Sequence, residues 1–193
     1  MNNIAIFASG SGTNAQRLIE HFLQMTGAKV RILLTNRKNA GVTERAKSLG
    51  VPVKVFDKEE FYASDIIVDY LLKENINWII LAGFLWLIPS NILKSFPKKI
   101  VNIHPALLPK YGGKGMYGMN VHRAVIEAKE KESGITIHYV NEEYDRGDII
   151  FQSVCRVCET DTPETLAGKI HELEYKYFPV VMENLILNNN NNV

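Results

Sequence analysis

Cysteine is scarce in this chain, which has only Cys155 and Cys158 among its 193 residues. Their C-x-x-C spacing occurs in redox pairs and in halves of zinc sites, but no second such pair follows to complete four ligands. Both lie at the end of a β-like stretch, residues 149–158, where positions three apart point to opposite faces of a strand. We therefore expect one cysteine to face inward and the other outward, without a redox or metal role.

Charge of one sign is not in excess either, because 22 Lys+Arg stand against 21 Asp+Glu and the formal net charge is +1. A protein that coats nucleic acid would usually show a strong basic excess. The longest apolar run, residues 78–88, is too short to span a bilayer, and no basic segment precedes the first apolar stretch at the N-terminus. We expect a cytoplasmic protein with no nucleic-acid partner and no membrane contact.

Two kinds of catalytic motif are also missing. The five histidines do not form a metal-spaced cluster, and no G-x-S-x-G nucleophile motif occurs. The chemistry is therefore expected to proceed by direct transfer, with neither a metal nor a covalent intermediate.

The first half of the chain alternates short apolar runs with helical patterns. Strands are expected at residues 4–8, 30–34, 53–56, 78–82 and 100–103, and helices at 14–25, 43–49, 65–74 and 121–128. Repeated β-α-β units predict an α/β fold of Rossmann-like type, with a doubly wound, mostly parallel sheet and helices on both faces. In such sheets ligands bind beyond the carboxyl ends of the strands, so functional residues should follow the apolar runs.

The last part of the chain predicts two strands, at 135–140 and 149–158, and a long final helix that runs to Leu187. Thr162 is a candidate N-cap for this helix, but Thr165 stands at the third position, so a full capping box is not expected. We expect residues 1–187 to form a single domain, because this length buries most apolar surface in one core. The asparagine-rich tail, 188–193, is of low complexity and is expected to be disordered.

The first predicted strand is followed by the glycine-containing loop Ser9-Gly10-Ser11-Gly12-Thr13-Asn14, and then by a helix. Glycines bring backbone N–H groups close to a ligand, and a helix N-terminus favours an anion. Three interpretations are open: a phosphomonoester site, a dinucleotide site and an empty tight turn. The dinucleotide interpretation lacks the acidic residue expected after the second strand, although Arg37 could accept a 2′-phosphate.

The fifth predicted strand ends in Asn102 and His104, which are two residues apart and so face the same way. An amide donor beside an imidazole is what an acyl-transfer site needs to stabilise an oxyanion. Asp145, in the turn before the last strand, is a third candidate, because a nearby carboxylate favours the charged imidazole. The alternatives are a strand-end pair that satisfies backbone groups and an aspartate that merely forms a turn.

Together these residues resemble the phosphoribosylglycinamide formyltransferase (glycinamide ribonucleotide transformylase) family, folate-dependent enzymes of purine biosynthesis. The resemblance runs from Asn3 to about Leu187, and four segments carry it. These are Ser9-Gly10-Ser11-Gly12-Thr13-Asn14, Leu81-Ala82-Gly83-Phe84, Asn102-Ile103-His104-Pro105-Ala106-Leu107-Leu108-Pro109 and Tyr144-Asp145-Arg146-Gly147-Asp148. It implies transfer of the formyl group of the co-substrate 10-formyltetrahydrofolate to the amine of glycinamide ribonucleotide, in a monomer or homodimer.

The resemblance also implies roles for individual residues. The catalytic residues would be Asn102, His104 and Asp145. The ribonucleotide would be bound by Gly12, Thr13, Asn14, His171 and Glu174, although a solvated helix face is the alternative for the last two. The folate would be bound by Leu85, Trp86, Leu87, Ile88, Lys58, Asn102, Asn141, Glu142, Glu143, Tyr144 and Asp145.

The chain departs from many relatives in three places. Trp86 stands where a basic residue is common, and Lys58 aligns only loosely with a basic residue that contacts the folate. The loop 111–118 is rich in glycine, and either closes on substrate or is an ordinary surface loop.

Other functions are carried as alternatives. They are formyltetrahydrofolate deformylase and methionyl-tRNA formyltransferase, whose usual extra domains have no room in this length, and an NADP-binding module, which would leave Asn102, His104 and Asp145 unexplained.

Overall fold

A seven-stranded sheet forms the centre of the computed structural model, which describes residues 1–188. Its strands are β1 (Asn2–Phe7), β2 (Ala28–Thr35), β3 (Val53–Val55), β4 (Trp78–Leu81), β5 (Ile100–His104), β6 (Glu132–Tyr139) and β7 (Ile149–Arg156). The spatial order is β3-β2-β1-β4-β5-β6-β7, with β1 to β5 parallel and the last two strands antiparallel. The predicted mostly parallel sheet is confirmed, and the predicted strand ends agree within three residues.

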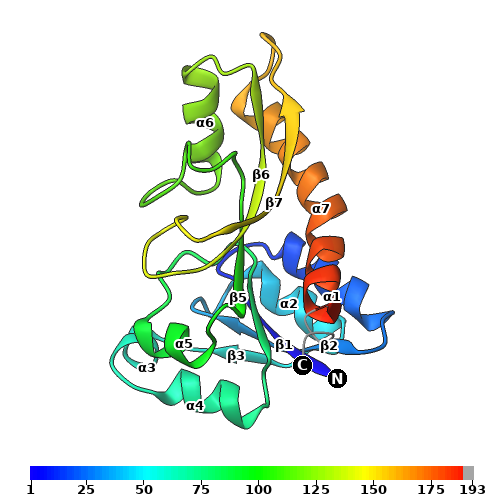
Figure 1. Ribbon diagram of the computed structural model, residues 1–193, viewed down its shortest axis with the longest axis vertical. Coiled ribbons are helices and arrows are strands. Elements are labelled where there is room, and N and C mark those ends of the chain that lie inside the picture. Colours follow the sequence, from blue (N-terminus) through cyan, green and yellow to red (C-terminus); the bar gives the residue numbers. More distant parts are fainter. Residues whose placement is uncertain (189–193) are drawn as a thin grey trace.

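Helices cover both faces of this sheet (Figure 1). They are α1 (Thr13–Leu23), α2 (Gly41–Ser48), α3 (Lys58–Tyr62), α4 (Ile66–Lys73), α5 (Ser90–Ser95), α6 (Met119–Glu127) and α7 (Pro163–Asn188). One apolar cluster joins the sheet to α1, α2, α6 and α7, and a second joins the other face to α3, α4 and α5. Strand β1 explains why both faces are apolar: Ile4 and Ile6 enter the first cluster, Ala5 and Phe7 the second.

The two helices that the sequence pattern missed, α3 and α5, have five and six residues. Neither length gives the 3.6-residue period room to repeat. A signal for α3 was nevertheless present, because Asp57 and Glu60 form a capping box through reciprocal hydrogen bonds of 2.9 and 3.0 Å.

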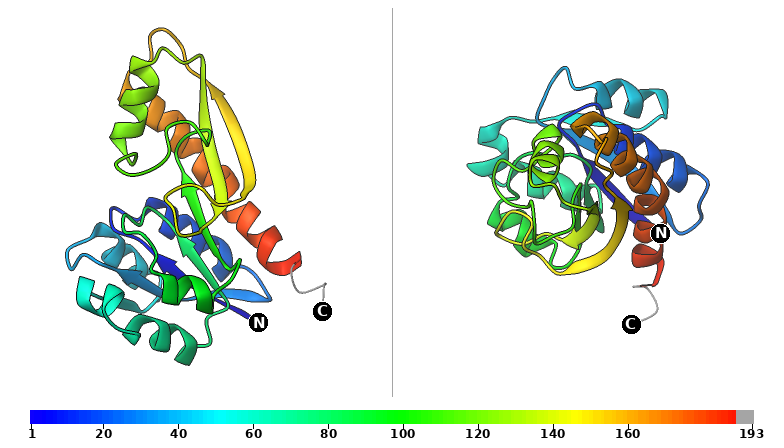
Figure 2. Two further views of the ribbon diagram at one scale, coloured as in Figure 1. Left: turned by 60° about the vertical axis from the view of Figure 1, so that its left-hand side comes forward. Right: turned by 90° about the horizontal axis from the view of Figure 1, so that it is seen from above.

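Helix α7 has 26 residues and runs along the length of the molecule, past α6, β6 and α1 (Figures 1 and 2). The expectation that its N-terminus lacks a full capping box was wrong. The Thr165 N–H donates to Oγ1 of Thr162 at 3.3 Å, and the Thr162 N–H donates to Oγ1 of Thr165 at 2.9 Å. A threonine hydroxyl thus replaces the usual Glu or Gln side chain. The helix ends at Asn188, and the rest of the predicted tail lies outside the described residues.

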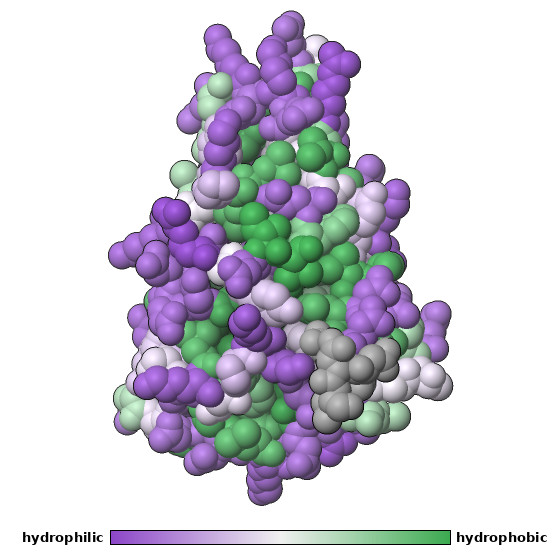
Figure 3. Space-filling model, in the orientation of Figure 1, coloured by the Kyte–Doolittle hydropathy of each residue, from purple (hydrophilic) through white to green (hydrophobic). Residues whose placement is uncertain are grey.

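Strand β7 lies at the edge of the sheet and carries both an apolar face and the first cysteine. Ile149 and Val154 are exposed on it, and Figure 3 shows apolar residues gathered over β7 and the middle of α7. Cys155 is half-buried against the core and Cys158 is exposed beyond the strand. Within residues 1–188, no helix has the length and apolarity needed to cross a membrane.

Candidate active site

A cavity of about 640 Å³ opens beyond the carboxyl ends of β1, β4 and β5. The predicted residues that line it are Gly12, Thr13, Asn14, Leu85, Trp86, Leu87, Ile88, Asn102, His104, Glu143, Tyr144, Asp145, His171 and Glu174. Lys58, Asn141 and Glu142 are not among its lining residues. The position agrees with the expectation that ligands of a parallel sheet bind past its strand ends.

Ser9 joins three of the loops that frame the cavity. Its hydroxyl donates to Oδ1 of Asn36 at 2.8 Å and accepts from the Leu85 N–H at 3.2 Å. Its own N–H donates to the Gly83 carbonyl at 3.0 Å. Because Ser9 is buried, these bonds fix the loops after β1, β2 and β4 relative to one another.

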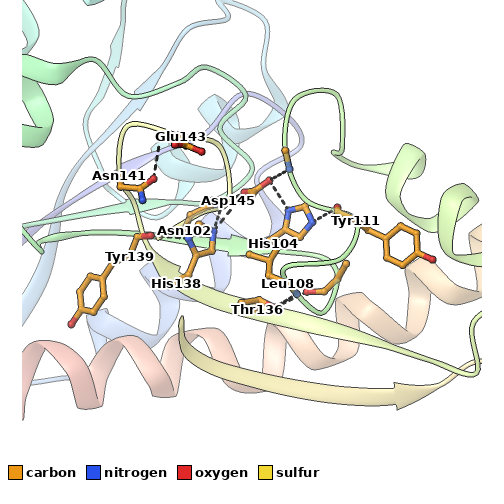
Figure 4. A network of polar contacts seen from close by, with 12 residues as sticks. Asn102, His104, Leu108, Tyr111, Thr136, His138, Tyr139, Asn141, Glu143 and Asp145 are labelled. Carbon is orange, nitrogen blue, oxygen red and sulfur yellow. Dashed lines mark hydrogen bonds and ion pairs between the residues drawn. The ribbon is translucent and has the colours of Figure 1, made fainter. Parts of the chain in front are cut away.

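Asn102, His104 and Asp145 meet at one side of this cavity (Figure 4). The Asp145 carboxylate lies between the other two: Oδ1 accepts from Nδ2 of Asn102 at 3.4 Å, and Oδ2 lies 3.5 Å from Nδ1 of His104. The register of β5 aims Asn102 and His104 the same way. The loop between β6 and β7 brings in Asp145 from more than forty residues further along the chain.

Two backbone features of the β6–β7 loop place Asp145. Asp145 has a φ of +57°, a left-handed conformation that aspartate tolerates better than most residues. A Cβ at Gly147 would lie 1.7 Å from the Tyr139 carbonyl oxygen, so only glycine allows the loop to cross β6 this closely. The turn that contains Asp145 and Gly147 therefore places the Asp145 carboxylate in the site.

Electrostatics keep Asp145 ionised. Burial alone would raise its pKa, but the neighbouring His138 and His104 and the Gly113 N–H at 2.9 Å outweigh burial and lower it. His104 behaves differently. Burial lowers the pKa of this imidazole below its ordinary value, and Asp145 and the Tyr111 carbonyl offset the shift only in part. The substrate-free site therefore pairs a carboxylate with a histidine that is mostly neutral near pH 7.

His138 belongs to the same network, although no motif in the sequence singled it out. Its Nδ1 donates to the Tyr139 carbonyl at 2.8 Å, which leaves Nε2 to accept from Nδ2 of Asn102 at 3.1 Å. Nε2 also lies 3.6 Å from Oδ1 of Asp145. His138 is buried, and the pairing of β6 with β5 sets it opposite Asn102.

The loop after β1 reaches the same cavity as a tight turn into α1. Gly12 is the N-cap of α1 with a φ of +80°, and no side chain caps the first N–H groups. A Cβ on Gly12 would lie 2.3 Å from Cγ2 of Val42 on α2. The turn therefore leaves helix N–H groups free to meet an anion, and requires glycine to do so.

Glu174 is buried at 6% exposure, so the alternative of a solvated helix face is wrong for this residue. Its Oε2 accepts from Nδ2 of Asn14 at 2.9 Å, which joins α7 to the first loop. Burial raises its pKa to about 7. His171, one turn earlier, is exposed and stacks on Tyr175 at 5.9 Å between ring centroids. Nearby His122 is buried, and burial lowers its pKa to about 4.

Residues 2–182 match the family model described as "Formyl transferase". The chain belongs to the formyl transferase family. It is 45% identical over 185 residues to a chloroplastic phosphoribosylglycinamide formyltransferase of Arabidopsis thaliana, covering 93% of this chain and 63% of that protein. It is 34% identical to phosphoribosylglycinamide formyltransferase of Bacillus subtilis, covering 98% of this chain and 97% of that one.

Solved structures agree with this assignment. The crystal structure of phosphoribosylglycinamide formyltransferase from Bacillus halodurans shares 36% identity and superposes with a TM-score of 0.86, covering 96% of this chain and 95% of that one. The present chain spans 63% and 60% of the length of two plant relatives, from Arabidopsis thaliana and Vigna unguiculata.

In this formyl transferase, Trp86 and Phe84 line the cavity. Trp86 lies against Phe56, Phe61 and Phe84, with ring centroids 5.7 to 6.3 Å apart. Nζ of Lys58 lies 5.9 Å from the Trp86 ring, so the lysine flanks this ring without lining the cavity. The assignment of Lys58, Asn141 and Glu142 to folate binding stays a prediction.

Substituting Glu174 by glutamine tests its burial in this formyl transferase. The folded protein holds the carboxyl proton up to about pH 7, whereas the unfolded chain releases it near pH 4.5. The contribution of this carboxyl to the free energy of unfolding is therefore complete below pH 4.5. It falls by about 3 kcal/mol as the pH rises to about 7. Relative to Glu174→Gln, the wild type should lose unfolding free energy across this interval in urea titrations. Glu172→Gln, on the exposed side of α7, is the control, and parallel pH curves for the wild type and Glu174→Gln would contradict the assignment.

Proposed function

We propose that this protein transfers the formyl group of 10-formyltetrahydrofolate to the amine of glycinamide ribonucleotide, a step of purine biosynthesis. The observation that carries the proposal is the convergence of Asn102, His104 and Asp145 on a cavity that also contains the Gly12 turn. The name of the Bacillus subtilis relative, which this chain covers over 97% of its length, supports it. The proposed chemistry uses the polar groups of Asn102, His104 and Asp145.

The mechanism follows from the proton positions in the site. The neutral amine attacks the formyl carbon, and negative charge develops on the formyl oxygen. The Asn102 amide stabilises this oxyanion, and so does His104 in the fraction of molecules in which its imidazole is protonated. His104 donates from Nε2 to a carbonyl, so its Nδ1 is the nitrogen that gains or loses a proton, and Asp145 lies beside it. Asp145, through water, then helps to move the amine proton to the leaving folate nitrogen.

One assay separates this function from its alternatives. Release of tetrahydrofolate from 10-formyltetrahydrofolate should require glycinamide ribonucleotide and should yield the formylated ribonucleotide. Release with water alone would favour a deformylase-type hydrolase. Failure of both, with binding of NADP, would favour a dinucleotide-binding module.

The phosphate part of the proposal is tested by Gly12→Ala. Alanine is strained at a φ of +80°, and its Cβ would meet Val42, so the turn must move away from its present path. A loss of about 1–2 kcal/mol corresponds to about a tenfold rise in KM for the ribonucleotide, while KM for the folate should stay unchanged. Gly168→Ala, on α7 with open space around its Cβ position, is the control. Equal changes in both KM values would argue against a phosphate at this turn.

The remaining parts of the proposal concern the location of the protein in the cell, its oligomeric state and its partners. We propose a cytoplasmic location and a monomer or homodimer that binds no nucleic acid. Cell fractionation and analytical ultracentrifugation test these points. Two plant relatives are named as chloroplastic, so fractionation of the source organism is the informative experiment.

A further inference from the structure

The shortest polar contact of His104 is made with the backbone, outside the group of residues expected to be catalytic. Nε2 of His104 donates to the Tyr111 carbonyl at 2.7 Å (Figure 4). A carbonyl oxygen only accepts, so this bond fixes the proton on Nε2 and turns Nδ1 towards Asp145. The placement of the Tyr111 carbonyl therefore decides which nitrogen of His104 takes part in proton transfer.

The backbone of Tyr111 is itself unusual. Its φ is +56°, a left-handed conformation that is unfavourable for a bulky residue. Such a conformation persists only where surrounding contacts hold it. Without those contacts the peptide of Tyr111 would be free to rotate, and its carbonyl would leave His104.

The Tyr111 ring packs against the first apolar cluster, and its polar contact lies outside the cavity. The Tyr111 hydroxyl donates to Oε1 of Glu130 at 2.9 Å, and Nζ of Lys110 donates to the same oxygen at 2.8 Å. Glu130 lies in the connection between α6 and β6. Neither Tyr111 nor Glu130 lines the cavity, so neither is placed to touch a substrate there. In Figure 4 the Tyr111 ring points away from His104 while its carbonyl points towards it.

We propose that Tyr111 is a positioning residue for His104, and that Glu130 keeps it in place by accepting the tyrosine hydroxyl. This inference rests on the proposed formyl transfer and adds to it two residues that act through the histidine. The hydrogen bond between the Tyr111 hydroxyl and Glu130 keeps the Tyr111 peptide in its left-handed conformation, and the carbonyl of that peptide orients the His104 imidazole. The bond to the carbonyl also favours the charged form of His104, against the effect of burial.

The decisive variant is Tyr111→Phe, which removes one hydroxyl and keeps the ring. We expect kcat to fall about tenfold, the effect of about 1.4 kcal/mol, with both KM values unchanged. The pKa of His104, followed by NMR in the ligand-free protein, should fall. The titratable groups around His104 are Asp145 in the β6–β7 loop, His138 on β6 and His122 on α6, and this variant leaves all three in place.

Three further variants separate positioning from general damage. Glu130→Ala should reproduce the loss, whereas Glu130→Gln retains an accepting oxygen and should restore kcat to near the wild-type value. Lys110→Met removes the other partner of Glu130 and should leave both kcat and the His104 titration unchanged. The double variant Tyr111→Phe with Glu130→Ala should be no worse than either single variant, because both break the same contact.

Several results would overturn the inference. One is an unchanged kcat and His104 titration in Tyr111→Phe; another is a Glu130→Gln variant as slow as Glu130→Ala. A loss of thermal stability with a normal His104 titration would show a structural role only. If the wild type transfers no formyl group, the proposed function fails, and the NMR titration still decides whether Tyr111 and Glu130 position the histidine.

Discussion

Asp145→Asn should lower kcat by about 10²–10⁴-fold, the usual size of acid–base assistance, with smaller changes in both KM values. The substitution is well suited to the site because asparagine also tolerates the φ of +57° found here. Its side-chain oxygen can still accept from the Gly113 N–H, so the loop has reason to stay in place. What is lost is the negative charge beside Nδ1 of His104 and the group that relays the proton.

The matched control is Asp161→Asn. Asp161 also accepts from a backbone N–H, that of Cys158 at 2.7 Å, and also lies beside a basic side chain, with Nζ of Lys169 at 2.5 Å. It lies before α7, away from the cavity. Single-turnover measurements of both variants separate chemistry from product release. Near-normal turnover of Asp145→Asn would remove Asp145 from the mechanism, and an equal loss in Asp161→Asn would attribute the effect to folding.

The sequence predicted those parts of the site that follow from strand direction. Asn102 and His104 were found because a parallel sheet gathers ligands at its carboxyl ends and because residues two apart share a face. The same reasoning located the Gly12 turn. Each of these inferences needs only a few neighbouring residues and the type of sheet.

Contacts between segments far apart in the chain could not be predicted from local patterns and strand direction. His138 was passed over because its role depends on the register of β6 against β5, which no local pattern states. The Tyr111 carbonyl and Glu130 act through backbone conformation and through an approach of two loops. For Glu174 a solvated face and a ligand role were equally compatible with the helical pattern. In the structure its buried carboxylate accepts from Asn14, 160 residues earlier in the chain.

The second large effect is expected for Asn102→Asp, a change that conserves shape and alters only the amide. Nδ2 of Asn102 donates to Nε2 of His138 at 3.1 Å and to Oδ1 of Asp145 at 3.4 Å. A carboxylate in its place removes a donor to the oxyanion, a loss of about 10²–10³ in kcat. It also places two carboxylates side by side, which raises the pKa of one of them.

The pH dependence of kcat therefore distinguishes a shared proton from the simple loss of a hydrogen-bond donor. In the wild type the contacts of Asp145 lower its pKa, so the carboxylate stays ionised through the neutral range. In Asn102→Asp the pair shares a proton, and the acid limb of the kcat profile should move to higher pH. Residual turnover should accordingly increase as the pH rises, whereas loss of a donor alone would lower kcat at every pH.

Asn91→Asp makes the same chemical change outside the cavity. Nδ2 of Asn91 donates to Oδ1 of Asp65 at 2.8 Å in an exposed contact, so this variant also sets two carboxylates together. It should leave kcat and its pH profile unchanged. Because Asn91 and Asn102 each donate an amide hydrogen to an aspartate, the difference between the two variants isolates what the location of Asn102 contributes. A wild-type profile in Asn102→Asp would mean that its amide stabilises neither the oxyanion nor the ionised Asp145.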